Sequence, residues 1–117
     1  MKRERTREPE PMPMHMTEKE LSAQIVREAK NCGWLCYHTW LSKYSPAGFP
    51  DLAMVRNGQL LAWELKGANG KVSLAQREWL DALALVPGVD ARVVRPADLE
   101  EAYKMLVSGI QKGDDHA

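Results

Sequence analysis

The dipeptide Asn57-Gly58 constrains the fold of this chain more than any other feature. It separates two mainly apolar runs, and a type I′ hairpin turn needs a positive φ at both central residues, which Asn and Gly tolerate best. A two-residue turn at this point pairs the residues on either side of it. Because antiparallel pairing continues outward from the turn, Asp51 is predicted to lie directly opposite Glu64.

Two carboxylates and one ammonium group are therefore predicted to meet at the open end of the hairpin. Directly opposed strand residues point to the same face, with Cβ atoms roughly 5 Å apart. Lys66 returns to the face of Glu64 because side chains alternate along a strand. Two like charges so close repel each other, and a divalent cation is the usual reason to keep them together.

The alternative interpretation of these residues is purely structural. Asp51 follows a proline and can be a turn residue, while Glu64 and Lys66 can belong to a solvated strand face. The apolar run 60–63, continued by Leu65, favours a central strand instead. Charges at the end of a central strand are costly unless they are paired or bound to a metal.

The length and composition indicate one soluble globular domain. The chain has 117 residues, of which 44% are hydrophobic and 27% charged. It contains no apolar run of membrane-spanning length and no signal-peptide pattern. Cys32 and Cys36 are its only cysteines, which favours reduced thiols in the cytoplasm. We expect residues 1–16 to be a disordered leader, 17–110 the folded domain and 111–117 a flexible tail.

The charge balance limits how the protein can bind nucleic acid. Its formal net charge is zero, which argues against a protein that coats nucleic acid non-specifically, since that mode needs a large cationic surface. A local basic rim around the acidic site remains possible. Lys43, Arg56, Lys71 and Arg77 are the candidates for this rim. We expect DNA contacts from Lys43, Tyr44, Lys71 and Arg77, with Trp40 and Tyr44 as the candidates for stacking on an exposed base.

Periodicity and capping signals predict the order α-β-β-β-α-β, followed by a C-terminal helix. Thr17 with Glu20, and Ser73 with Gln76, have the spacing of capping boxes at helix starts. The expected helices are 17–33, 73–87 and 98–110, and the expected strands are 34–40, 51–56, 59–66 and 91–95. A parallel last strand beside the hairpin would give an α/β sandwich.

Several short motifs resemble those of one group of nucleases. Pro50-Asp51 followed by Glu64-Leu65-Lys66 is similar to the signature of the PD-(D/E)XK nuclease superfamily. The resemblance narrows to the VRR-NUC group through Gly48-Phe49-Pro50-Asp51, Ser73, Gln76, Trp79-Leu80 and Arg95-Pro96. It runs from about Thr17 to about Val107. It implies a nuclease domain over 17–110 with an α/β, restriction-endonuclease-like αβββαβ core, a mixed sheet flanked by helices and an extra C-terminal helix.

The chemistry of the site follows from its oxygen donors. Mg²⁺ prefers octahedral oxygen ligands and keeps several waters, and Asp51 and Glu64 offer two carboxylates for it. The resemblance implies the carbonyl of Leu65 as a third ligand, and Mn²⁺ is expected to substitute for Mg²⁺. Lys66 would orient the attacking water or stabilise developing charge, and a role as base is also open.

The two predicted helices offer further candidates. The resemblance implies an acidic residue on the first helix, for which Glu18 is favoured because its spacing to Leu21 places it on the inward stripe. Glu20 is the alternative, although it already serves the capping box. Gln76 shares a face with Trp79 and either reaches the metal site or only caps its helix.

A zinc site is the less favoured interpretation of the remaining metal-binding side chains. The spacing of Cys32, Cys36 and His38 straddles a helix end and a strand, so buried thiols and a satisfied histidine are favoured. His38 leads into the loop before Asp51, and a contact from His38 to phosphate remains open.

Together these features predict a metal-dependent DNA endonuclease that hydrolyses phosphodiester bonds with a metal-activated water. We expect it to select branched or junction DNA by shape and to act as a homodimer, with Met105 and Val107 at a possible interface. Stand-alone members of the group resemble phage-encoded and Holliday-junction-resolving enzymes, which implies work in a phage-infected bacterial cell. A non-catalytic nucleic-acid-binding module and an RNA-processing nuclease are the alternatives.

Overall fold

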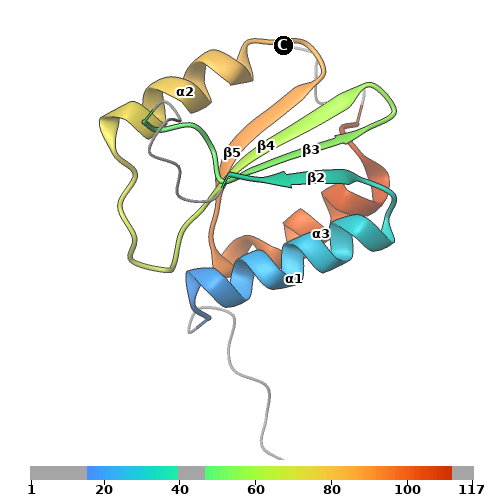
Figure 1. Ribbon diagram of the computed structural model, residues 1–117, viewed down its shortest axis with the longest axis horizontal. Helices are drawn as coiled ribbons and strands as arrows, with labels where there is room; N and C mark the ends of the chain where they lie inside the picture. The colour runs from blue at the N-terminus through green and yellow to red at the C-terminus, as the bar shows by residue number, and fades with distance from the viewer. Residues whose placement is uncertain (1–15, 40–46, 112–117) are drawn as a thin grey trace, which may run out of the picture.

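The computed structural model describes residues 16–39 and 47–111, and it has the predicted order of elements (Figure 1). All but one residue of the predicted leader and of the predicted tail lie outside these residues, as do Trp40, Lys43 and Tyr44. The fold is α/β with a mixed sheet, as expected for a restriction-endonuclease-like core. Its elements are α1 (Glu18–Asn31), β2 (Leu35–His38), β3 (Leu52–Arg56), β4 (Gln59–Leu65), α2 (Leu74–Ala84), β5 (Val89–Val94), η2 (Pro96–Asp98) and α3 (Leu99–Ser108).

The sheet has the strand order β2-β3-β4-β5, antiparallel except for the parallel pair β4–β5. The hairpin has the predicted register, which ends with Leu52 paired to Trp63. Asn57 and Gly58 have φ values of 51° and 78°, as a type I′ turn requires. Asp51 lies one position beyond the last pair, so it belongs to the loop that enters β3 and not to the ladder itself.

Helices α1 and α3 cover one face of the sheet and α2 covers part of the other (Figure 1). The buried positions Leu21, Ile25 and Ala29 recur every four residues along α1, so they form one stripe facing the sheet. Opposite them lie buried side chains of the strands, among them Leu52, Met54, Leu61, Trp63, Leu65 and Val94. Each such Leu or Ile side chain contributes roughly 1.5–3 kcal/mol by leaving water.

One corner of the core is held together by Trp34 and Arg56. The indole Nε1 of Trp34 donates to the carbonyl of Leu106 at 2.8 Å, and the Arg56 guanidinium lies 4.6 Å from the centre of the Trp34 ring. Arg56 also donates to the carbonyls of Cys32 at 2.8 Å and Leu106 at 3.1 Å. Arg56 is therefore part of the packing between α1 and α3, and its predicted place in a basic rim is wrong.

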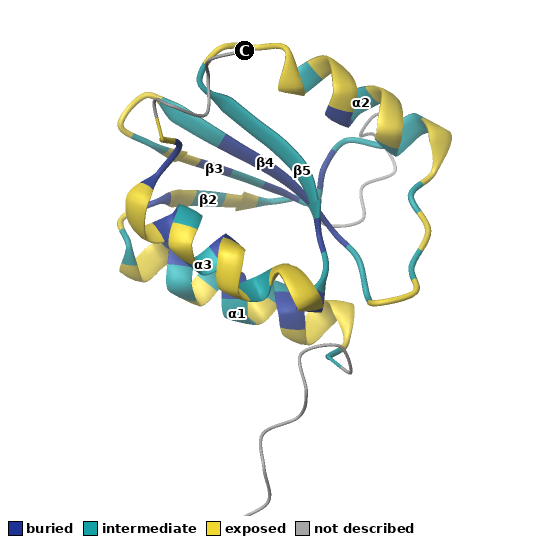
Figure 2. Ribbon diagram, turned by 180° about the vertical axis from the view of Figure 1, so that it is seen from behind, coloured by how far each residue is buried: buried dark blue, intermediate teal, exposed yellow. Residues whose placement is uncertain are grey.

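The second face of the sheet is covered unevenly. Helix α2 packs on β4 and β5, whereas β2 and β3 leave apolar side chains open to solvent (Figure 2). Leu35 is 76% exposed, Tyr37 65% and Val55 44%. The open strand β2 is also one edge of the sheet, next to α1.

Some predicted boundaries and orientations differ from the structure. Strand β5 begins at Val89, two residues early, because the Gly88 carbonyl already accepts from the Leu60 N–H at 2.9 Å. The helix expected over 73–87 ends at Ala84, and Val86 beyond it is 47% exposed. Met105 packs against the core, so of the two proposed interface residues only Val107 is on the surface.

Candidate functional site

Asp51 is held at the edge of the sheet where β2 and β4 end and β3 begins. Its Oδ2 accepts a hydrogen bond from the Leu65 N–H at 2.9 Å. Its carbonyl accepts from the N–H of Thr39 at 2.8 Å, and the Thr39 hydroxyl donates to the carbonyls of Pro50 at 2.9 Å and Asp51 at 3.2 Å. The Asp51 carboxylate is thus fixed toward the end of β4.

Glu64 is the one buried charged residue among the described residues, with 2% exposure. Its Oε2 accepts from Gln76 Nε2 at 2.9 Å and lies 3.6 Å from the Lys66 ammonium. Its Oε1 is buried and has no hydrogen-bond partner within the described part of the chain. Burial, and then the adjacent Asp51 carboxylate, raise the pKa of Glu64 to about 7, against a smaller opposing effect of Lys66.

Gln76 caps its helix and also reaches Glu64. Its Oε1 accepts from the Ser73 N–H at 2.8 Å, while the Ser73 hydroxyl accepts from the Gln76 N–H at 3.1 Å, which completes the capping box of α2. Its Nε2 is then free to donate to Glu64. The helix cap therefore aims this amide at the buried carboxylate.

Lys66 is supported from the loop that follows it. A Cβ placed on Gly70 would lie 3.3 Å from Lys66 Cδ, so this glycine gives the lysine side chain room. Arg95 Nη1 donates to the carbonyls of Gly67 and Gly70, both at 2.8 Å, and so closes the loop. The sequence marked Arg95 only as part of a motif. Its role on this loop depends on carbonyls 25 to 28 residues away, so local spacing gave no signal for it.

The chain segment that leads into Asp51 packs on α2. Gly48 has a φ of 93°, and a Cβ there would lie 2.5 Å from the Ala75 backbone. Phe49 meets Trp79 edge to face with ring centres 5.0 Å apart. The same helix therefore fixes both the segment carrying Asp51 and the amide that holds Glu64.

A groove of about 990 Å³ opens beside Asp51 and Leu65 and follows α1. Glu18 lines this groove, whereas Glu20 accepts from the Thr17 N–H at 2.9 Å in the capping box. The two candidate acids therefore lie in different settings, Glu18 at the groove and Glu20 in the cap of α1. Glu18 is exposed, however, and does not belong to the buried stripe of α1 on which it was predicted.

The other predicted residues lie in varied settings. His38 Nε2 is 3.0 Å from Ser22 Oγ, and both residues line the groove. Lys71 is exposed, and Arg77 forms a surface ion pair with Asp81 at 3.4 Å. In the described ranges no group of three or more His, Cys, Asp or Glu side chains is placed to hold a metal.

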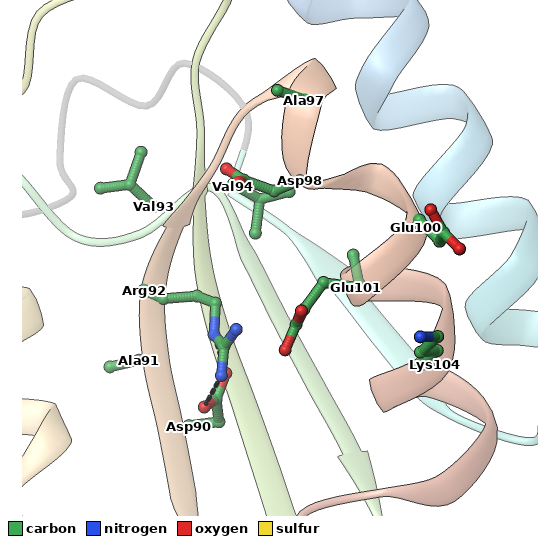
Figure 3. A pocket seen from close by; sticks show the side chains of 11 residues that line it. Asp90, Ala91, Arg92, Val93, Val94, Ala97, Asp98, Glu100, Glu101 and Lys104 are labelled. Carbon is green, nitrogen blue, oxygen red and sulfur yellow. Dashed lines mark hydrogen bonds and ion pairs between the residues drawn. The ribbon is translucent and has the colours of Figure 1, made fainter.

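A second hollow of about 620 Å³ lies between β5 and α3 (Figure 3). Arg92 and Asp90 form a two-point ion pair in it, at 2.6 and 2.7 Å, and Asp90 also accepts from Trp63 Nε1 at 2.8 Å. Hydrogen bonding to Asp90 raises the pKa of Arg92. This paired network holds the buried indole of Trp63 and is separate from the site at Asp51.

None of the helices formed by the described residues is long and apolar enough to cross a membrane.

The similarity of this chain to known proteins is limited to a family of domains. No curated protein and no solved structure shows significant similarity to the chain. The VRR-NUC domain family matches residues 2–98, which is most of the chain and includes Asp51, Glu64, Lys66 and Gln76. The chain therefore belongs to the VRR-NUC family, a group of PD-(D/E)XK nuclease-type domains.

Proposed function

We propose that this protein is a Mg²⁺-dependent endonuclease that hydrolyses phosphodiester bonds in DNA, with Mn²⁺ as a substitute ion. The observation that carries the proposal is the state of Glu64. One oxygen of its buried carboxylate is held by Gln76 and Lys66, and the other has no hydrogen-bond partner within the described residues. A buried carboxylate beside a second one is costly unless a cation compensates both.

The donor atoms suit Mg²⁺. Asp51, Glu64 and the Leu65 carbonyl offer oxygen only, which favours a hard cation over zinc. Mg²⁺ usually keeps several waters and binds through one or two carboxylates together with substrate phosphate, so a larger cluster of acidic side chains is not needed. When bound, the ion supplies an activated water and neutralises charge at the phosphorus.

The remaining side chains have distinct roles in this proposal. Lys66, with a largely buried side chain, keeps its ammonium beside Glu64 and orients the attacking water or stabilises negative charge on the phosphate. Gln76 fixes the rotation of the Glu64 carboxylate through Oε2. Glu18 adds a carboxylate on the groove side, where it can hold a water.

The main alternative is a nucleic-acid-binding module without catalytic activity. Such a module has no use for a buried carboxylate whose pKa is raised to about 7 beside a second carboxylate and a lysine. The alternative substrate is RNA, because the metal and the lysine act on a phosphodiester in either polymer. Cleavage of RNA in preference to DNA would identify an RNA-processing nuclease.

Selectivity for branched DNA and action as a homodimer complete the proposal. The described residues form one small domain around one site, which favours recognition of DNA shape over reading of a sequence. A symmetric junction presents two equivalent strands, and a two-fold dimer would bring one site to each. Light scattering at micromolar concentration tests this, and a monomer both free and on junction DNA would rule out paired incision.

The decisive experiment separates metal binding from chemistry. Wild type, Asp51→Asn and Lys66→Met are compared on duplex, flap, four-way-junction, single-stranded and RNA substrates with Mg²⁺ and Mn²⁺, and Mn²⁺ binding is followed by electron paramagnetic resonance. We expect Asp51→Asn to lose both binding and cleavage, and Lys66→Met to bind Mn²⁺ without cleaving. A folded Lys66→Met protein that cuts at the wild-type rate would show that the proposed site is wrong.

A further inference from the structure

The groove beside Asp51 has a line of positive charge that the proposed chemistry does not use. Lys19, Arg27 and Lys30 all line it from α1, and all three are exposed. No ion pair involving them is found within the described ranges. Because the net charge of the chain is zero, this row of unpaired cations on one helix face is a local concentration of positive charge and does not reflect an excess of positive charge over the whole protein.

One end of the groove lies at Asp51, and from there the groove extends along α1. Near the N-terminal end of α1, Ser22 meets His38 at 3.0 Å, and the next residue, Thr39, holds Asp51. At the other end of the helix, Lys30 lies close enough to Cys36 to act on its thiol, lowering a pKa that burial raises. Helix α1 and strand β2 therefore run side by side in opposite directions, and the groove leads away from Asp51 between them.

The length of this row fits a nucleic-acid backbone. Lys19 and Lys30 are separated by three turns of α1, which is roughly 16 Å at 1.5 Å per residue. That span corresponds to several phosphates of one strand. Tyr37 borders the groove on the edge strand β2, and its side chain, which lies on the second face of the sheet, is 65% exposed. A strand that leaves the groove across this edge can therefore stack an unpaired base on the Tyr37 ring. Duplex DNA offers no unstacked base to such a ring, which favours a single or splayed strand.

We infer that this groove binds the backbone of the single-stranded segment next to the phosphate to be cut, through Lys19, Arg27 and Lys30, with Tyr37 stacking on a base. The inference rests on the proposed function, because it takes Asp51 as the cutting end. It assigns the DNA contacts to α1 and β2, a different surface from Lys71 and Arg77.

The test measures binding without cleavage, so that it is independent of the proposed chemistry. Affinity for a fluorescent single-stranded oligonucleotide is measured by anisotropy across a salt series, in Ca²⁺ to prevent cutting. Lys30→Gln is compared with Lys104→Gln, which removes an exposed lysine on α3 at the other hollow. All of these positions are exposed, so the variants should fold normally.

We expect Lys30→Gln to lower the slope of log affinity against log salt by about 0.7, and the triple Lys19→Gln, Arg27→Gln, Lys30→Gln variant by about 2. Lys104→Gln should leave the slope unchanged. Tyr37→Ala should weaken single-strand binding roughly fivefold or more without changing the slope.

Two outcomes would overturn the inference. One is a triple variant that keeps the wild-type affinity and slope, and the other is an equal loss in Lys104→Gln. A wild type that binds with the expected slope but never cuts would leave the groove assignment standing and refute only the proposed chemistry.

Discussion

Gln76 joins the first turn of α2 to the buried Glu64 through a single amide. Its Oε1 accepts from the Ser73 N–H at 2.8 Å, and its Nε2 donates to Glu64 Oε2 at 2.9 Å. Because an N–H can be matched only by the amide oxygen, the cap also decides that the NH₂ group faces the carboxylate. The same side-chain amide of Gln76 therefore caps α2 and orients the Glu64 carboxylate.

Replacing Gln76 by Ala should reduce cleavage by about 10- to 100-fold, because loss of a partner that orients a metal ligand typically has that cost. Metal affinity should fall with it, since the rotation of Glu64 is no longer fixed. Titration of Mn²⁺ together with initial cleavage rates measures both effects.

Ser73→Ala provides the control for the cap alone. It removes the hydroxyl that accepts from the Gln76 N–H but leaves the Gln76 amide in place. We expect a loss of about 1 kcal/mol in unfolding free energy and near-normal cleavage. Equal loss of activity in both variants would show that Gln76 acts only through helix stability.

The pH dependence of stability should report the buried Glu64 carboxyl. Its pKa is raised to about 7 from the ordinary 4.5, so between these values the folded state binds a proton that the unfolded state has released. Metal-free protein should therefore lose stability as pH rises through this window. The total loss is on the order of 3 kcal/mol.

Glu64→Gln should abolish this dependence and make the metal-free protein more stable than wild type at pH 8, with little difference near pH 4. Urea unfolding in EDTA at a series of pH values measures it, with Glu78→Gln, an exposed acid on α2, as control. Adding Mg²⁺ should stabilise wild type and not Glu64→Gln. A wild type whose stability rises from pH 5 to pH 8 in EDTA, relative to Glu64→Gln, contradicts the assignment.

The parts of the fold that the sequence predicted are those governed by local chemistry. Asn57-Gly58 determines its own turn, and with it the hairpin register, because only a few residue types accept a positive φ. The two capping boxes are likewise contained within four residues each. Periodicity and these capping signals also predicted the order of helices and strands along the chain, with which the resemblance to a known family agreed.

The parts that it missed depend on contacts between distant segments. Arg56 has the composition of a rim residue, and only the approach of Trp34 and Leu106 makes it a packing residue. Thr39 and Arg95 act on carbonyls far along the chain, for which local spacing has no signal. The groove exists because α1 lies beside an edge strand, which periodicity alone does not predict.

Thr39→Val should weaken metal binding although Thr39 has no predicted contact with the ion. The change removes the hydroxyl that donates to the carbonyls of Pro50 and Asp51 but keeps the shape of the side chain. We expect a loss of roughly tenfold or more in Mn²⁺ affinity, as for other partners of metal ligands. Thr39→Ser restores the hydroxyl and should recover most of the affinity, whereas a purely steric role would leave Thr39→Val normal and Thr39→Ser impaired.

Arg95→Gln should slow catalysis while leaving metal binding intact. The Arg95 guanidinium donates to the carbonyls of Gly67 and Gly70 and so holds their loop against the end of β5. Lys66 directly precedes this loop, and its side chain packs against Gly70. Without the guanidinium, two carbonyls lose a charged donor and the loop loosens, at a cost of about 1–3 kcal/mol in stability. The Lys66 ammonium is then held less firmly, so kcat should fall roughly tenfold or more at saturating Mg²⁺.

A second variant disturbs the Lys66 side chain directly while leaving Arg95 in place. Gly70→Ala keeps Arg95 but adds a Cβ only 3.3 Å from Lys66 Cδ, which forces the lysine stem to shift. It should lower kcat by a smaller factor, again with unchanged Mn²⁺ affinity. Single-turnover cleavage and Mn²⁺ titration on both variants, with Lys104→Gln as control, decide the point. If metal affinity falls in step with kcat, Arg95 supports the whole site and not Lys66 in particular.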